Sequence, residues 1–165
     1  MNVTPEGFVY KGSTYYLSDL NQPQINEATL DLVKRAMEAD EDDPLFVLAI
    51  GAITNMPSAI LIEPKIIEKI VVVWLSGNAL HLPDIAEFNL KQDVLAARLI
   101  FDCGVPFVQI PYMGVTSHLH TTLLEINQYV RGQGRIGNFL AERFEGYHDD
   151  HFAYSKVILG SRLCN

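Results

Sequence analysis

Two polar side chains flank an aromatic residue at positions 87–89, and their chemistry suits a sugar. In an extended segment, Glu87 and Asn89 would point to the same side. A carboxylate accepts hydrogen bonds, whereas an amide both accepts and donates them, so the pair is a good receptor for vicinal hydroxyl groups. The alternative is that both residues belong to a polar loop that leads into a helix at Asp93.

Segment 51–55 follows an apolar run and precedes a helical pattern. A backbone carbonyl at the tip of a strand can be a ligand for a hard cation. The alternative is a simple connecting turn in which Asn55 caps the next helix.

Other polar groups are weaker candidates. Residues 147–151 contain two imidazoles and two carboxylates, which could bind zinc, but metal sites draw their ligands from separated elements, so a solvated loop is favoured. The acidic run 40–43 precedes a strand and is typical of a solvated helix end. Cys103 is most simply a small buried residue.

The elements that must position these residues alternate between strands and helices. Unbroken apolar runs predict buried strands, and the run 45–50 is typical of a strand that is buried on both faces. Asn26 is a suitable cap for the first helix. The alternation predicts an α/β fold, a mostly parallel sheet with flanking helices, whose ligands bind beyond the carboxyl ends of the strands. The expected segments are an irregular lead-in at 1–24, strands at 45–50, 70–75 and 105–110, and helices at 26–39, 58–62, 93–102, 121–130 and 136–144.

Composition restricts the class of protein. A chain of 165 residues with 48% apolar residues predicts a single domain, residues 1–165, and excludes intrinsic disorder and a disulfide scaffold. A net charge of −8 without a basic cluster argues against a nucleic-acid partner. The start resembles no signal peptide, and no apolar run approaches the roughly 20 residues of a membrane span, so we expect a cytoplasmic protein with no membrane partner.

The order and spacing of four segments resemble the nucleoside hydrolase family, the inosine–uridine-preferring nucleoside N-ribohydrolases. The resemblance covers about residues 44–158. Its most specific part is Glu-Phe-Asn at 87–89 with Asp93 and an Ala-Ala pair downstream. The segments that carry it are Ile-Gly-Ala-Ile-Thr-Asn at 50–55, Ile-Val-Val-Val-Trp-Leu-Ser-Gly-Asn at 70–78, the Glu-Phe-Asn block, and Gly-Val-Pro at 104–106.

The resemblance implies hydrolysis of the N-glycosidic bond of ribonucleosides, in purine and pyrimidine salvage. In the family, calcium at the carboxyl ends of the strands holds a water and the ribose hydroxyls, and the water attacks the anomeric carbon through an oxocarbenium-like state. By position, the backbone carbonyl of Thr54 would be a calcium ligand, and Glu87 and Asn89 would bind ribose. Either Asn78 or His81 would fill a further ribose-binding position.

Several features depart from the family. The N-terminal Asp-x-Asp-x-x-x-Asp-Asp cluster, which supplies most calcium ligands and the general base, does not occur in that context here. Ser76 stands where the family usually has glycine. In part of the family Ser-Lys-Val-Ile is followed by Trp-Asp, whereas this chain has Leu159-Gly160. We therefore expect an internal fragment of the family fold.

The last seven residues have a specific explanation. Leu-Gly can be encoded TTG-GGA, and the same bases read one position later begin TGG-GA, which is Trp followed by the start of Asp. Residues 159–165 would then be a frameshifted tail. The less favoured alternative places the late aspartate at Asp149, after His148.

The remaining candidates are too few for the family's chemistry. Calcium takes about six to eight oxygen ligands, and the resemblance leaves one carbonyl and the hydroxyl-binding pair. We expect no catalytic residue, no calcium held by this chain alone, and little or no hydrolase activity. The alternatives are a non-catalytic ribose- or nucleoside-binding module, a self-associating homo-oligomer with exposed strand edges, and a half-chain that a separate polypeptide complements.

Overall fold

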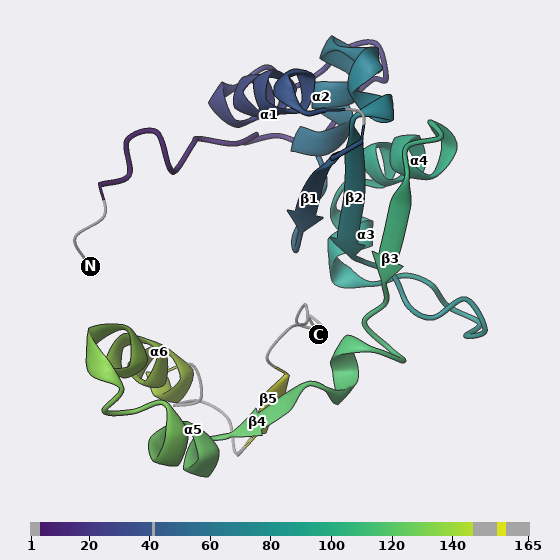
Figure 1. Cartoon of the computed structure of the whole chain (residues 1–165). Helices are drawn as coiled ribbons and strands as arrows, with labels where there is room; N and C mark the ends of the chain where they lie inside the picture. Colours follow the sequence, from purple (N-terminus) through teal and green to yellow (C-terminus); the bar gives the residue numbers. More distant parts are fainter. Residues whose placement is uncertain (1–3, 41, 147–154, 158–165) are drawn as a thin grey trace.

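The computed structural model describes residues 4–40, 42–146 and 155–157 (Figure 1). A three-stranded sheet with helices packed on it occupies the N-terminal two thirds, and a smaller unit of helices and a short ribbon follows. In chain order the elements are α1 (Glu27–Glu38), β1 (Leu45–Ala49), α2 (Asn55–Ile62), the 3₁₀ helix η1 (Pro64–Glu68), β2 (Ile70–Leu75), α3 (Phe88–Gln92), α4 (Val94–Asp102), β3 (Phe107–Ile110), the 3₁₀ helix η2 (Thr116–His118), β4 (His120–Thr122), α5 (Leu123–Tyr129), α6 (Gly134–Gly146) and β5 (Ser155–Val157).

The sheet has the order β1-β2-β3, and both strand pairs are parallel. Leu45 lies opposite Ile70, and Val72 lies opposite Phe107. Helical connections join successive strands, as parallel pairing requires. The predicted α/β fold with a parallel sheet is confirmed, so the carboxyl ends of the three strands meet at one edge.

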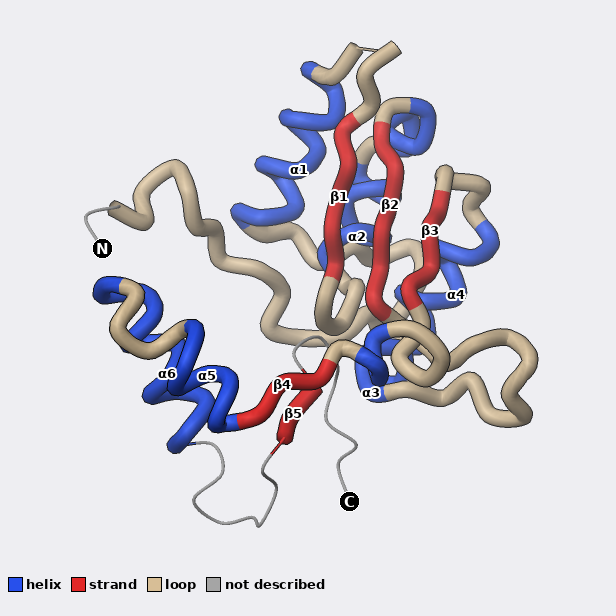
Figure 2. Tube along the Cα trace, turned by 60° about the horizontal axis from the view of Figure 1, so that its bottom comes forward, coloured by secondary structure: helices blue, strands red, loops and turns tan. Residues whose placement is uncertain are grey.

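The hydrophobic core lies between the sheet and the layer of α1, α2 and α4, which covers one face (Figure 2). Ile70, Val72 and Trp74 project from β2 into this layer, and all are almost fully buried. The indole N–H of Trp74 donates to the carbonyl of Gly51, 2.9 Å away, just beyond the end of β1. This bond ties the central strand to the turn that begins the candidate site.

The prediction that β1 is buried on both faces is wrong. Its side chains alternate, and Phe46, Leu48 and the following Ile50 are 60%, 75% and 72% exposed. The reason is that the helices lie on one side of the sheet only. The apolar run therefore predicted a strand correctly, but it could not show which of its side chains the helices cover.

Several element predictions are confirmed with shifted bounds. Asn26 caps α1, where its side chain accepts from the backbone N–H of Thr29 at 3.0 Å. The helix predicted at 58–62 begins earlier, at Asn55. The helix predicted from 121 begins at Leu123, because Thr121 and Thr122 belong to β4, which pairs with β5 in an antiparallel ribbon that the sequence did not reveal.

The lead-in and the C-terminal helices lie outside the sheet layers. Residues 4–26 contain no helix or strand and run past α1 toward the carboxyl end of the sheet. Helices α5 and α6 pack on each other and stand away from the sheet in both views (Figures 1 and 2). No helix in the described ranges is long and apolar enough to cross a bilayer. The proposed frameshifted tail, 159–165, lies outside the described residues.

Candidate functional site

Asp93 ties together three segments at the carboxyl end of the sheet. Its carboxylate accepts hydrogen bonds from the backbone N–H of Leu17 at 2.9 Å, from the hydroxyl of Thr54 at 2.6 Å, and from the backbone N–H of Ala96 at 2.9 Å. The last bond makes Asp93 the N-cap of α4. Three donors satisfy the hydrogen-bonding capacity of this buried carboxylate, and its bonds to Leu17 and Thr54 fix the lead-in against the start of α2.

The carbonyl of Thr54, which the resemblance assigns to calcium, already has hydrogen-bond partners. It accepts from the backbone N–H of Ser58 at 3.2 Å and from the Ser58 hydroxyl at 2.8 Å. Both bonds belong to the first turn of α2. A cation would have to share this oxygen with two donors.

Asn55 does not cap α2. Thr54 occupies the N-cap position without a side-chain cap bond. The amide oxygen of Asn55 instead accepts from the backbone N–H and the hydroxyl of Ser13, at 2.9 and 2.7 Å, and from the amide of Asn26 at 3.3 Å. Asn55 therefore holds the lead-in at the end of β1.

The expected extended conformation at 87–89 is wrong. Glu87 is the N-cap of α3, and Asn89 lies within that helix. The Glu87 carboxylate accepts from the backbone N–H groups of Asn89 at 2.9 Å, Leu90 at 3.3 Å and Gly77 at 3.1 Å. A carboxylate that satisfies orphan N–H groups of a helix start is more stable than one in an extended loop.

Asn89 also has a bond within the protein, because its side-chain amide donates to the carbonyl of Leu75 at 2.9 Å. Glu87 is 1% exposed and Asn89 is 4% exposed. Neither side chain reaches a solute in this conformation. Their role in ribose binding stays a prediction that requires the loop between β2 and α3 to open.

Gly77 allows this arrangement. Its φ of +62° is in the left-handed region that favours glycine, and a Cβ there would lie 2.7 Å from the side-chain nitrogen of Gln109. The Gln109 amide donates to the carbonyl of Ser76 at 2.9 Å. The loop can thus turn sharply after β2 and bring the Gly77 N–H to Glu87.

The two alternatives for the further ribose position lie in the same loop. The Asn78 amide oxygen accepts from the backbone N–H of Met113 at 3.2 Å, and its nitrogen donates to the carbonyl of Asp84 at 3.0 Å. His81 is exposed in the part of the loop beyond Asn78. The structure gives Asn78 a role in shaping the loop and gives His81 access to solvent.

Two buried hydroxyl groups near this edge lack a partner. The side chains of Ser76, directly after β2, and Thr116, at the start of η2, have no hydrogen-bond partner among the described residues. Sequence reasoning noted Ser76 only as a departure from glycine and did not single out Thr116. A buried hydroxyl without a partner is suited to a water or a polar ligand.

A pocket of about 500 Å³ adjoins Thr54 and Asn55. Its wall is polar and aromatic, and half of it comes from the lead-in, which sequence reasoning treated as irregular. The lining residues are Ser13, Thr14, Tyr15, Tyr16, Ala52, Thr54, Asn55 and Gln92. The Tyr16 hydroxyl donates to the side-chain oxygen of Gln92 at 3.1 Å, so the two sides of the pocket are joined.

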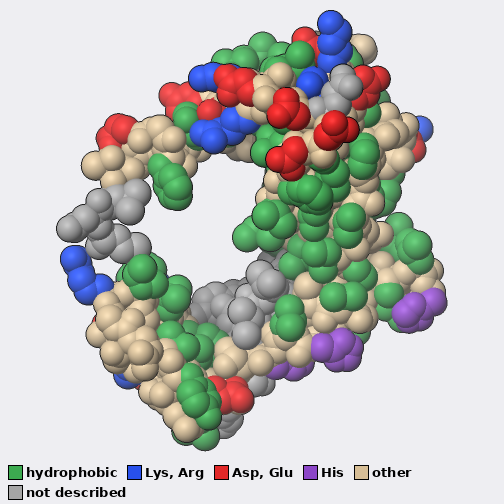
Figure 3. All heavy atoms as spheres, viewed as in Figure 1, with side chains coloured by type: hydrophobic (Ala, Val, Ile, Leu, Met, Phe, Trp, Pro, Cys, Tyr) green, Lys and Arg blue, Asp and Glu red, His purple; other side chains and the backbone are tan. Residues whose placement is uncertain are grey.

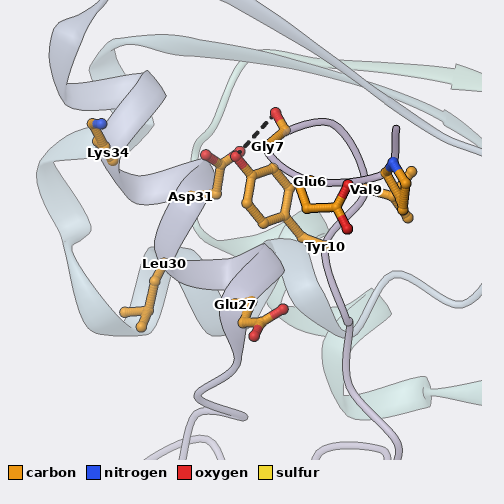
Figure 4. Close-up of a pocket in the computed structure, with 9 residues that line it drawn as sticks. Glu6, Gly7, Val9, Tyr10, Glu27, Leu30, Asp31 and Lys34 are labelled. Atoms are coloured by element: carbon orange, nitrogen blue, oxygen red, sulfur yellow. Dashed lines mark hydrogen bonds between the residues drawn. The ribbon is translucent and has the colours of Figure 1, made fainter. Parts of the chain in front are cut away.

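A second hollow of about 680 Å³ lies between the start of the lead-in and α1 (Figure 4). The Tyr10 hydroxyl donates to the carbonyl of Gly7 at 3.3 Å, and Asp31 lies beside it. The guanidinium of Arg35, which bonds the Asp31 carboxylate at 2.6 Å, lowers the pKa of Asp31. None of the predicted site residues lines this hollow, so it is not the candidate site.

The donors that the structure describes at this edge do not by themselves make up a calcium site. Within the described ranges, no group of three or more His, Cys, Asp or Glu side chains lies close enough to hold a metal ion. The Thr54 carbonyl and the Asp93 carboxylate at this edge are both hydrogen-bonded. The cluster predicted at 147–151 and the alternative Asp149 lie outside the described residues.

Comparison with known proteins gives the family. The model of the family described as inosine-uridine preferring nucleoside hydrolase matches residues 5–164. The chain belongs to this family. The putative pyrimidine-specific ribonucleoside hydrolase RihB of Shigella boydii serotype 4 is 32% identical over 124 residues, which are 73% of this chain and 50% of that protein. The probable uridine nucleosidase 2 of Arabidopsis thaliana is 24% identical over 115 residues, 67% of this chain and 35% of that protein.

Solved structures agree with this assignment. The purine-preferring ribonucleoside hydrolase from Gardnerella vaginalis superposes with a TM-score of 0.64 at 26% identity, over 74% of this chain and 39% of that one. An inosine-uridine preferring nucleoside hydrolase from Bacillus anthracis shares the fold, with a TM-score of 0.59 at 22% identity, over 72% of this chain and 41% of that one. This nucleoside hydrolase family member thus spans half or less of the length of these relatives.

Proposed function

We propose that this chain carries part of the nucleoside site of a ribonucleoside hydrolase and that, by itself, it binds nucleoside without hydrolysing it. Family membership over residues 5–164 supports the substrate class. The names of the relatives include pyrimidine-specific and purine-preferring ribonucleoside hydrolases, so the base preference stays open. The pocket beside Thr54 and Asn55 supports binding.

The pocket offers groups that recognise a ribose. Hydroxyls of Ser13, Thr14 and Tyr16 and the amides of Asn55 and Gln92 supply both donors and acceptors. The rings of Tyr15 and Tyr16 offer apolar surface against which a sugar or a base can pack. A volume of about 500 Å³ lies within the range of small-molecule pockets.

The observation that supports a lack of hydrolysis is the hydrogen bonding of the buried carboxylates. Hydrolysis of a glycosidic bond needs a carboxylate that activates water. Glu87 and Asp93 each accept three hydrogen bonds from the protein, at the start of α3 and of α4. Their oxygens hold the fold together, and neither is placed to take a proton from a water. Calcium would supply an activated water in the family, but the donors described above do not by themselves make up a site for it.

The experiment has two measurements on the full chain. We expect no release of ribose from inosine or uridine, with or without added calcium chloride. We expect uridine to shift the NMR resonances of Ser13, Asn55 and Gln92. Gln92→Ala removes one amide from the pocket and should weaken binding about fivefold, the effect of one hydrogen bond. Gln128→Ala, on the exposed side of α5, is the matched control and should leave binding unchanged.

The outcomes separate the two parts of the proposal. Calcium-dependent release of ribose above the background of a mock purification would show that the chain is a complete catalyst. The assignment of binding to the pocket would be wrong if the resonance shifts were scattered over the surface. It would also be wrong if Gln128→Ala weakened binding as much as Gln92→Ala. Neither result depends on the other.

A further inference from the structure

We draw no further inference here: the strongest candidate, the apolar face of the sheet opposite α1, α2 and α4 (Figure 3), is exposed in a chain that spans half or less of the length of the relatives described above, and nothing within the described residues shows what covers it.

Discussion

Asp93 illustrates how one carboxylate can be more important for the fold than for chemistry. Its three donors come from the lead-in, from the residue before α2, and from the first turn of α4. These segments are far apart in the sequence, and the bonds place them at the carboxyl end of the sheet. Removing the carboxylate would leave buried donors at Leu17 and Thr54 without an acceptor.

We predict that Asp93→Ala lowers the free energy of unfolding by about 3 kcal/mol, since buried unpaired donors cost about 1–3 kcal/mol each and part of that is recovered by relaxation. Asp93→Asn should cost less, because one acceptor oxygen remains. Urea denaturation with an unchanged m-value is the measurement. Asp102→Ala is the matched control, because Asp102 is exposed and forms a surface ion pair with Arg98, so its cost should stay under about 1 kcal/mol. Equal costs for Asp93→Ala and Asp102→Ala would contradict the structural role.

For individual residues, the sequence indicated which polar side chains to consider for the candidate site, but it did not indicate which groups they contact. The spacing of Glu87 and Asn89 predicted a shared face, and the alternative of a polar loop before the helix at Asp93 was closer to the structure. The deciding contact is the bond from Gly77 to Glu87, which joins residues 10 positions apart. No local pattern reveals such an approach, because it depends on the left-handed turn after β2.

Among the elements, α5 depends on a reciprocal cap. The Thr122 hydroxyl accepts from the backbone N–H of Glu125 at 3.2 Å, and the Glu125 carboxylate accepts from the backbone N–H of Thr122 at 2.7 Å. The bond from the Thr122 backbone lowers the pKa of Glu125, and the hydroxyls of Thr122 and Thr121 lower it further. The ionised carboxylate therefore stabilises the start of the helix.

We predict a pH dependence that follows from the direction of this shift. Because the pKa of Glu125 is lower in the folded chain, its stabilisation is fully present above the ordinary value of 4.5 and is lost as pH falls through the folded pKa. Carbon-detected NMR titration of the Glu125 carboxyl should show a midpoint below 4.5. Thr122→Ala keeps the backbone donor but removes a hydroxyl, so the midpoint should move part of the way back. A midpoint that does not respond to Thr122→Ala would contradict the cap.

The elements were predictable to different degrees for physical reasons. The cap at Asn26 and the helix stop near the acidic run are local, and both were predicted. The burial of β1 depends on which layers exist around it, so a run of apolar residues could not show that Phe46 and Leu48 face outward. The pairing of β4 with β5 joins segments separated by α5 and α6, and no alternation in such short strands signals it.

For the whole molecule, the effect of calcium on stability tests whether the carboxyl end of the sheet binds a metal ion. Anything that binds the native state and not the unfolded chain raises the melting temperature. A calcium site occupied at a hundred times its dissociation constant would add about 2.7 kcal/mol, which corresponds to roughly 5–10 °C for a chain of this size.

We predict that millimolar calcium leaves the Tm of the full chain unchanged, because the described residues at the sheet end offer no group of three or more metal-binding side chains. Differential scanning fluorimetry with calcium chloride, magnesium chloride and a chelator is the measurement. A rise that is specific to calcium, and that the chelator reverses, would show that the chain holds the ion after all.

The position of Trp74 gives the molecule an internal optical reporter. It is the single tryptophan of the chain, it is fully buried in the central strand, and its indole N–H is bonded to Gly51 at the edge of the candidate pocket. Its emission is therefore sensitive to water entry between the sheet and the helical layer, and it is remote from the α5–α6 pair. Fluorescence from this one chromophore can follow the formation of the parallel core during refolding in a stopped-flow experiment. Quenching by acrylamide can measure how often the turn after β1 opens to solvent.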